Sequence, residues 1–132
     1  MFSNIKTSKK NKDIVQELTR KLNLGSENVI ARIAFAYSLS KDNSLNLTQL
    51  QDAQGKEYSA RILFGDYLPY YVALICVQYD LYIEDKDVGR YVKLHVDDGL
   101  DLIHREFGKS NLSGIEFLIQ KIELGLGKLE YG

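Results

Sequence analysis

The sequence predicts an all-α fold, a single domain over residues 1–132 with about five to six helices and a short N-terminal strand. Two observations favour this fold class. The chain has 132 residues, an ordinary length for one domain, and is 45% hydrophobic and 27% charged, as globular chains are. It also has one proline and no tryptophan in a leucine- and isoleucine-rich sequence. This composition favours helices over a sandwich of many strands.

The first forty residues predict a strand-helix-helix unit. Residues 2–7 form a short extended lead, and Ser8 or Thr7 can cap a helix over residues 8–22 by accepting a bond from a backbone N–H. A turn at residues 23–25 opens a second helix over residues 26–39, capped by Ser26. In the first helix the apolar side chains recur at helical spacing and so share one face: Ile14, Val15, Leu18 and Leu22.

Positive charge is concentrated in this unit. Over residues 1–21 six cations oppose only Asp13 and Glu17, whereas the whole chain has a formal net charge of -1. Several of the cations lie beside a helix start, where positive charge is unfavourable against the helix dipole. A solvated helix face is the plainer explanation. The alternative is a DNA-contacting unit over residues 1–40, with six phosphate-binding candidates: Lys6, Lys9, Lys10, Lys12, Arg20 and Lys21.

The middle of the chain predicts one long connection and a third helix. Residues 40–57 are polar and rich in turn formers, and residues 58–64 are expected to be extended. The third helix opens at Gly65 and Asp66, with Asp66 as its cap and Pro69 in the first turn, and runs towards Tyr82.

Three further helices are expected in the last third of the chain. One covers residues 88–96, and Asp97 or Asp98 caps the next, which ends at Phe107 because Gly108 suits a left-handed stop. The last begins at Ser113. Residues 125–132 are glycine-rich and are expected to form a flexible tail.

The second helix predicts self-association. Its side chains are apolar around most of its circumference, and a single domain of this size rarely needs so wide an apolar helix. We therefore expect a homo-oligomer that assembles through this helix and through the tyrosine-bearing third helix.

Composition and motifs also limit the cellular compartment and the kinds of activity that the protein can have. The lone Cys76 allows no intrachain disulfide, the N-terminus is polar, and no apolar run is expected to approach the ~20 residues that span a bilayer. We expect a cytoplasmic protein with no membrane partner. The sequence carries no complete Gly-x4-Gly-Lys-Ser/Thr phosphate loop, because Gly108-Lys109-Ser110 has Ile103 where the first glycine belongs. It also has no Cys-x-x-Cys pair and no Gly-x-Ser-x-Gly elbow, so we expect neither an enzyme nor a cofactor.

One cluster could bind a metal, because its histidines and carboxylates are close in sequence: His95, Asp97, Asp98, Asp101 and His104. Capping and first-turn roles for the aspartates explain the same residues without a metal. A metal-dependent nuclease therefore stays open as an alternative, although the favoured prediction contains no metal site.

Several short segments resemble the family of the DNA sulfur modification protein DndE. They are IKTS at residues 5–8, NVIARIA at 28–34, LFGDY at 63–67, GRYVKLH at 89–95 and GL at 99–100. Their order and spacing, rather than any one of them, make the resemblance specific, and it covers most of residues 3–104.

The resemblance implies a mostly helical, non-catalytic component of the bacterial machinery that replaces a non-bridging phosphate oxygen of DNA with sulfur. It also implies a tetramer that binds duplex DNA, with a preference for nicks, through surface lysines. Partner proteins of the complex would supply the sulfur-transfer and ATP-using steps. The acidic centre at residues 80–106, with eight carboxylates against four cations, leaves only one face to meet DNA.

A strand-helix-helix start also resembles ribbon-helix-helix repressors, which pair two strands as a ribbon in the major groove. In such a regulator Asn4 and Lys6 would point at bases, while Ser3, Ile5 and Thr7 would face inward. The extra ~90 residues after the unit argue against a minimal repressor.

Overall fold

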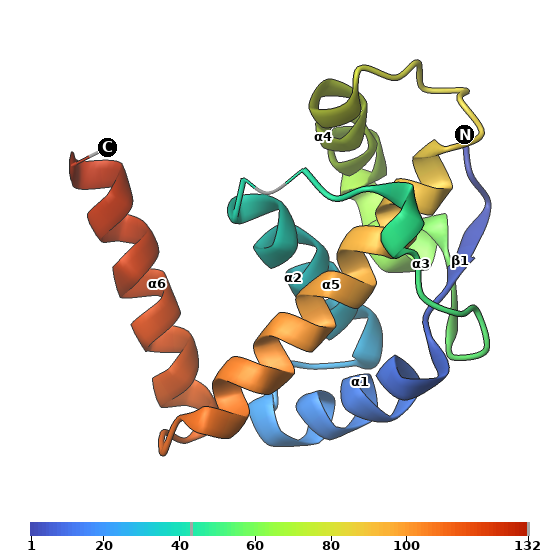
Figure 1. Cartoon of the computed structure of the whole chain (residues 1–132). Helices are drawn as coiled ribbons and strands as arrows, with labels where there is room; N and C mark the ends of the chain where they lie inside the picture. Colours follow the sequence, from blue (N-terminus) through green and yellow to red (C-terminus); the bar gives the residue numbers. More distant parts are fainter. Residues whose placement is uncertain (43, 132) are drawn as a thin grey trace.

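The computed structural model describes residues 1–42 and 44–131. The elements follow in this order: β1 (Asn4–Lys6), α1 (Lys9–Leu22), α2 (Glu27–Ser40), η1 (Leu47–Gln49), β2 (Glu57–Ser59), α3 (Ala60–Phe64), η2 (Gly65–Tyr67), α4 (Leu68–Tyr79), α5 (Val88–Lys109) and α6 (Gly114–Tyr131). The predicted fold class is confirmed, because the protein is a mostly helical single domain that begins with the strand-helix-helix unit β1–α1–α2 (Figure 1).

Strand β1 pairs with β2 of the same chain. The two are antiparallel, with Ile5 opposite Tyr58 and Lys6 opposite Glu57. Ile5 and Tyr58 point into the core, whereas Asn4 and Lys6 are exposed, as the alternation along a strand requires. The extended segment expected over residues 58–64 is correct only at its start, because Ser59 accepts a bond from the Ile62 N–H and caps α3.

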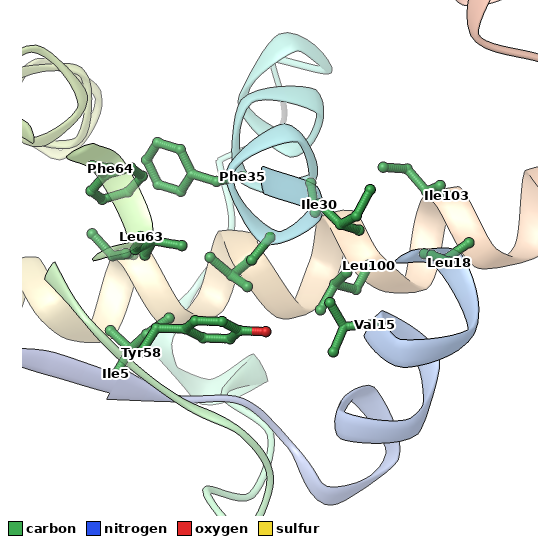
Figure 2. Close-up of a cluster of buried hydrophobic side chains, with 14 of the residues drawn as sticks. Ile5, Val15, Leu18, Ile30, Phe35, Tyr58, Leu63, Phe64, Leu100 and Ile103 are labelled. Carbon is green, nitrogen blue, oxygen red and sulfur yellow. The ribbon is translucent and has the colours of Figure 1, made fainter. Parts of the chain in front are cut away.

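Helices α2 and α5 cross at the centre of the molecule and make its most extensive helix contact. The crossing is close because Gly99 of α5 has no side chain, and a Cβ built there would lie 1.8 Å from the carbonyl oxygen of Ala34. Core side chains from β1, α1, α2, β2, α3 and α5 surround the crossing (Figure 2).

Residues 88–109 form one helix where the sequence predicted two. Asp97 and Asp98 are interior residues of α5, so the expected break and cap between residues 96 and 98 are wrong. The expected left-handed stop at Gly108 is also wrong, since the helix continues to Lys109 and the positive-φ glycines of the described residues are Gly25 and Gly65. Asp97 instead accepts bonds from Ser8 and Asn11 at the start of α1, and Asp98 accepts one from Ser38 of α2. In the sequence alone, two adjacent aspartates of this kind are not distinguishable from a helix cap.

Helix α2 packs one face into the domain core. Its buried residues are Ile30, Ala31, Ala34, Phe35 and Ser38, and α1, α3 and α5 of the same chain cover them. Packing within one chain thus buries one part of its apolar surface, whereas Val29, Ile33 and Leu39 stay partly exposed. The predicted oligomer interface through this helix therefore remains a prediction. Ser26 precedes α2, but its side chain makes no capping bond to a backbone N–H.

The segment before and within α4 differs from the expected third helix. Gly65 has a φ of 59° and ends α3, and the side chain of Asp66 does not cap α4. Pro69 lies in the first turn as predicted, but α4 ends at Tyr79, with Asp80 in the left-handed conformation.

The stretch Ala60–Tyr79 has a mean hydropathy of 1.3 over its most apolar part and is long and apolar enough to cross a membrane. The expectation that no run approaches this length is therefore wrong. Here the stretch is divided at Gly65, and Leu63, Phe64, Val72 and Ile75 from it pack into the domain core. Only 28% of this window is buried, and its other apolar side chains, among them Tyr70, Leu74 and Val77, are exposed on the surface of α4.

The C-terminal residues extend a helix that the sequence predicted to stop. Helix α6 runs through Gly125 and Gly127 to Tyr131, so the tail expected over residues 125–132 is helical up to that residue. Gly132 lies outside the described residues. The two glycines each weaken a helix by only about 1 kcal/mol, which neighbouring helix formers such as Leu124 and Leu126 can offset.

Candidate nucleic-acid interface

The candidate interface is built on the first turns of α1. Ile14, Val15, Leu18 and Leu22 are buried, so the opposite face of the helix must carry its polar residues. Ser8 caps α1 as predicted, because its side chain accepts a bond from the Asn11 N–H at 3.1 Å. Lysines 9, 10 and 12 are exposed at this end, directly after exposed Lys6 of β1.

The structure separates the six predicted cations into two sets. Lys10 Nζ lies 3.1 Å from Asp101 Oδ1, and Lys21 Nζ lies 2.6 Å from Glu17 Oε1. The remaining four are exposed and form no ion pair with other described residues: Lys6, Lys9, Lys12 and Arg20. Arg20 is in the last turn of α1, where a cation suits the helix dipole. We call Lys6, Lys9 and Lys12 the basic edge.

A buried carboxylate holds the start of α1 in place. Asp97 Oδ1 accepts bonds from the Ser8 N–H at 3.1 Å and from Asn11 Nδ2 at 2.8 Å. Its Oδ2 lies 2.7 Å from Nζ of Lys93, one turn earlier on α5. Asp97 is 1% exposed, so these contacts replace water almost completely. Its negative charge at the helix N-terminus also offsets the unfavourable position of the neighbouring lysines.

The loop before β2 supports the same helix end. Asp52 Oδ1 accepts a bond from the Lys9 N–H at 2.8 Å, and this bond is the main reason why the pKa of Asp52 is lowered. The Gly55 N–H donates to the Thr7 carbonyl oxygen, and a Cβ at Gly55 would lie 2.0 Å from the Ser8 carbonyl oxygen. The backbone that carries the basic edge is therefore fixed from both sides.

Sequence reasoning missed two cations beside the basic edge. A hollow of about 350 Å³ is lined by Phe2, Lys6, Gly89 and Lys93, together with the exposed Lys86 and Arg90. Arg90 also pairs with Asp87 at 3.2 Å. Lys86 and Arg90 belong to the segment that the sequence marked as acidic, and only the packing of β1 on α5 brings them to Lys6.

On the other side of α1, carboxylates neutralise the positive charges of the lysines. A groove of about 540 Å³ between α1 and α5 is lined by Lys10, Asp13, Ile14, Glu17, Asp101, His104 and Arg105. The pKa of Glu17 is lowered, mainly by its hydrogen bond with Lys21. Apart from Arg20 in the last turn of α1, the predicted cations without an ion pair among the described residues thus lie towards β1 rather than in this groove.

The histidines of the proposed metal cluster have separate environments. His104 Nε2 faces Glu17 of α1 at 3.2 Å, whereas His95 is buried against Ser38 and Tyr79. Among residues 1–42 and 44–131, no three His, Cys, Asp or Glu side chains gather closely enough to bind a metal ion. Asp97 binds the start of α1 instead of capping a helix.

A chain of hydrogen bonds fixes His95 as neutral. Ser38 donates to Asp98 at 2.6 Å, so the imidazole must donate from Nδ1 to Ser38 Oγ at 2.8 Å. Tyr79 accepts from the Leu45 N–H and donates to Nε2 at 2.6 Å. A proton on Nε2 would remove the acceptor for Tyr79. Burial lowers the pKa of His95 to about 4, although nearby Asp98 acts in the opposite direction.

His95 should therefore make the protein less stable in acid. The unfolded chain binds a proton near pH 6.5 and the folded chain only near pH 4, so stability present above pH 6.5 is lost as the pH falls towards 4. Urea unfolding of the wild type should show a loss of about 3 kcal/mol from this residue between pH 7 and pH 4. A His95→Gln variant should lack this component. Equal pH dependence of the two proteins, or a ring that titrates near pH 6.5 by NMR in the folded wild type, would contradict the assignment.

The fold and the site define a small, mostly helical protein with one rigid basic edge. The family model for the DNA sulphur modification protein DndE matches residues 4–111, and the chain belongs to this family. The resemblance seen in the sequence is thus confirmed. No curated protein matches the chain by sequence.

Two solved DndE structures share the fold. DndE from Escherichia coli B7A, involved in DNA phosphorothioation modification, has a TM-score of 0.64 and 18% identity. A mutant DndE involved in DNA phosphorothioation has a TM-score of 0.66 and 18% identity. In both cases the match covers 78% of this chain and 98% of the solved chain.

Proposed function

We propose that the chain is a non-catalytic, DNA-binding component of a cytoplasmic DNA phosphorothioation complex. It holds duplex DNA, with a preference for nicked duplex, through contacts to backbone phosphates. It acts as a homo-oligomer, a tetramer as the family resemblance implies, together with other proteins of the complex that carry out the sulfur chemistry. Membership of the DndE family supports the pathway.

The observation that carries the DNA-binding proposal is the basic edge. Lys6, Lys9 and Lys12 are exposed and form no ion pair with the described residues, while the backbone beneath them is fixed by Asp97 and Asp52. Lysines that are free to pair with phosphate release counterions from DNA, and this release drives sequence-independent binding. Lys86 and Arg90 extend the same surface across β1 and are further candidates for phosphate contacts.

The ribbon-helix-helix alternative is disfavoured by the partner of β1. In such a repressor the first strand pairs with the same strand of a second copy, whereas here β1 pairs with β2 of its own chain. Asn4 does face outward, as that alternative expected, but its side-chain amide donates to Glu57. The nuclease alternative loses its main support because His95 and His104 bind different neighbours.

A titration of the full chain with nicked, intact and single-stranded DNA of one sequence tests the proposal. We expect the tightest binding to nicked duplex and similar affinities for unrelated sequences. If one protomer contacts three phosphates, a fourfold rise in salt should weaken binding roughly 40-fold. Binding that depends strongly on sequence, or no binding to any of the three DNAs at low salt, would contradict the proposed function.

A further inference from the structure

Helix α6 lies outside the part of the chain that the family shares. The family model ends at residue 111, and α6 begins at Gly114. The solved DndE chains are covered almost completely by 78% of this chain. The shared fold is thus complete without α6, and this helix needs another explanation than the domain core.

Over residues 114–127, where side chains are described, one side of α6 is attached to the body. Phe117 is buried, and its ring packs edge-on against Phe107 with 5.1 Å between centroids. Lys121 Nζ lies 3.3 Å from Glu106 of α5, and Gly114 abuts the backbone of Lys21. From this base the helix projects away from the other helices (Figure 1).

A second side of α6 is apolar and unpaired. Its side chains are 50–62% exposed and follow one another at intervals of four, three and four residues: Ile115, Ile119, Ile122 and Leu126. We call these four residues the α6 seam. Intervals of this kind place side chains in one line along a helix and are the pattern of coiled-coil contacts. A groove of about 480 Å³ lies beside the seam, between α6 and α2. Ile33, Leu118, Ile122 and Leu124 form its apolar lining, and Lys41 and Lys121 also line it.

We propose that the α6 seam is an interface between copies of this chain, in which α6 packs in parallel against α6 of a second copy. Isoleucine at both kinds of seam position, with leucine at the last, favours bundles of more than two helices. The interface would therefore suit an assembly larger than a dimer. The proposal rests on the homo-oligomer of the proposed function and names a surface that would form it, and it needs no contact with DNA.

The charges beside the seam favour the parallel direction. Glu116 and Glu123 are exposed along one edge of the seam, while Leu118 and Gly125 occupy the other edge. In a parallel pair Glu123 would lie near Leu118 of the second copy, whereas an antiparallel pair would bring glutamates opposite one another. Lys121 is already held by Glu106.

The same charges disfavour a membrane as the occupant. Helices that lie on anionic bilayers carry lysine and arginine on their polar face. Along residues 114–127 the exposed polar side chains of α6 are Glu116, Gln120 and Glu123, and the one cation of this stretch, Lys121, pairs with Glu106. A helix of 18 residues is also too short to pair stably on its own, so the adjoining groove on α2 would have to add contact area.

The mass of the full chain in solution, without DNA, tests the interface. Wild type at micromolar concentration should sediment well above 15.1 kDa, and Ile119→Asp should reduce the mass. Gln120→Asp adds the same charge at an exposed polar position of α6 and should leave the mass unchanged. Circular dichroism should show equal helix content in all three proteins, because both positions are exposed.

A cysteine pair tests the direction of packing. In a Cys76→Ala chain, Ile119→Cys should form a disulfide between copies on mild oxidation, because equal seam positions face one another in a parallel bundle. Gln120→Cys should not. A monomeric wild type, an unchanged mass for Ile119→Asp, or equal cross-linking at both positions would overturn the proposal. A monomeric wild type would also contradict the homo-oligomer of the proposed function, whereas the other two outcomes would overturn only the α6 seam. None of them bears on the proposed DNA binding.

Discussion

Replacing Gly99 with alanine should destabilise the protein by about 3 kcal/mol or more, because overpacking against a fixed neighbour forces the backbone to move. The added Cβ would lie 1.8 Å from the carbonyl oxygen of Ala34 and 2.9 Å from its Cα. These atoms belong to the backbone of α2 and cannot rotate away. Helices α2 and α5 would have to separate along the largest helix contact of the fold. Urea unfolding followed by circular dichroism measures the change.

Gly108 of the same helix provides the matched control. A Cβ built there meets nothing within 4 Å. Gly108→Ala should therefore stabilise the protein by up to about 1 kcal/mol, because alanine is the better helix former. If Gly99→Ala is no more destabilised than Gly108→Ala, then α2 and α5 do not cross as closely as the structure shows.

Replacing Asp97 with alanine should have the second large effect. The change leaves the Ser8 N–H and the Asn11 amide without their main acceptor, and leaves the largely buried Lys93 ammonium without its carboxylate. Breaking one side of a buried pair costs about 3–5 kcal/mol. An ordinary helix cap would cost only about 1 kcal/mol. The two explanations of Asp97 thus differ severalfold in the measured free energy of unfolding.

Two further variants separate the contributions at Asp97. Asp97→Asn keeps the shape and can still accept one bond, so it should cost less than Asp97→Ala. Adding Lys93→Met to Asp97→Ala removes the unpaired charge and should restore part of the stability. A loss of about 1 kcal/mol for Asp97→Ala with no rescue by Lys93→Met would show that Asp97 is no more than a local cap.

Local signals predicted the local structure well. The apolar face of α1, its Ser8 cap, Pro69 at the start of α4 and the facing of β1 all depend on residues within a few positions of one another. The broad fold class followed from the same signals. The basic edge was also visible, because its lysines are neighbours in sequence.

Long-range partners caused the errors. Asp97 contacts Asn11, and Ser38 contacts His95 and Asp98. These partners are 57 to 86 residues apart in the sequence, so patterns among neighbouring residues could not predict the contacts. A Gly after two aspartates resembles a helix boundary, yet Gly99 is where α2 approaches α5. Lys86 and Arg90 were missed for the same reason, because they reach Lys6 only through the packing of β1 on α5. The partner of Lys10, Asp101, also lies on α5, whereas Lys21 pairs with Glu17 of its own helix at a spacing that the sequence shows.

The salt dependence of DNA affinity tests the central claim most directly. A double variant, Lys9→Gln with Lys12→Gln, should weaken binding to every DNA sequence. It should also flatten the plot of log affinity against log salt by roughly 0.9 units for each phosphate that a protomer no longer neutralises. Adding Lys6→Gln should flatten the plot by a similar further step. The matched control, Lys41→Gln with Lys109→Gln, removes the same charge outside the basic edge and should leave the slope nearly unchanged. If the Lys9 and Lys12 variant keeps the affinity and slope of wild type, or behaves as the control does, the basic edge is a solvated surface and does not bind DNA.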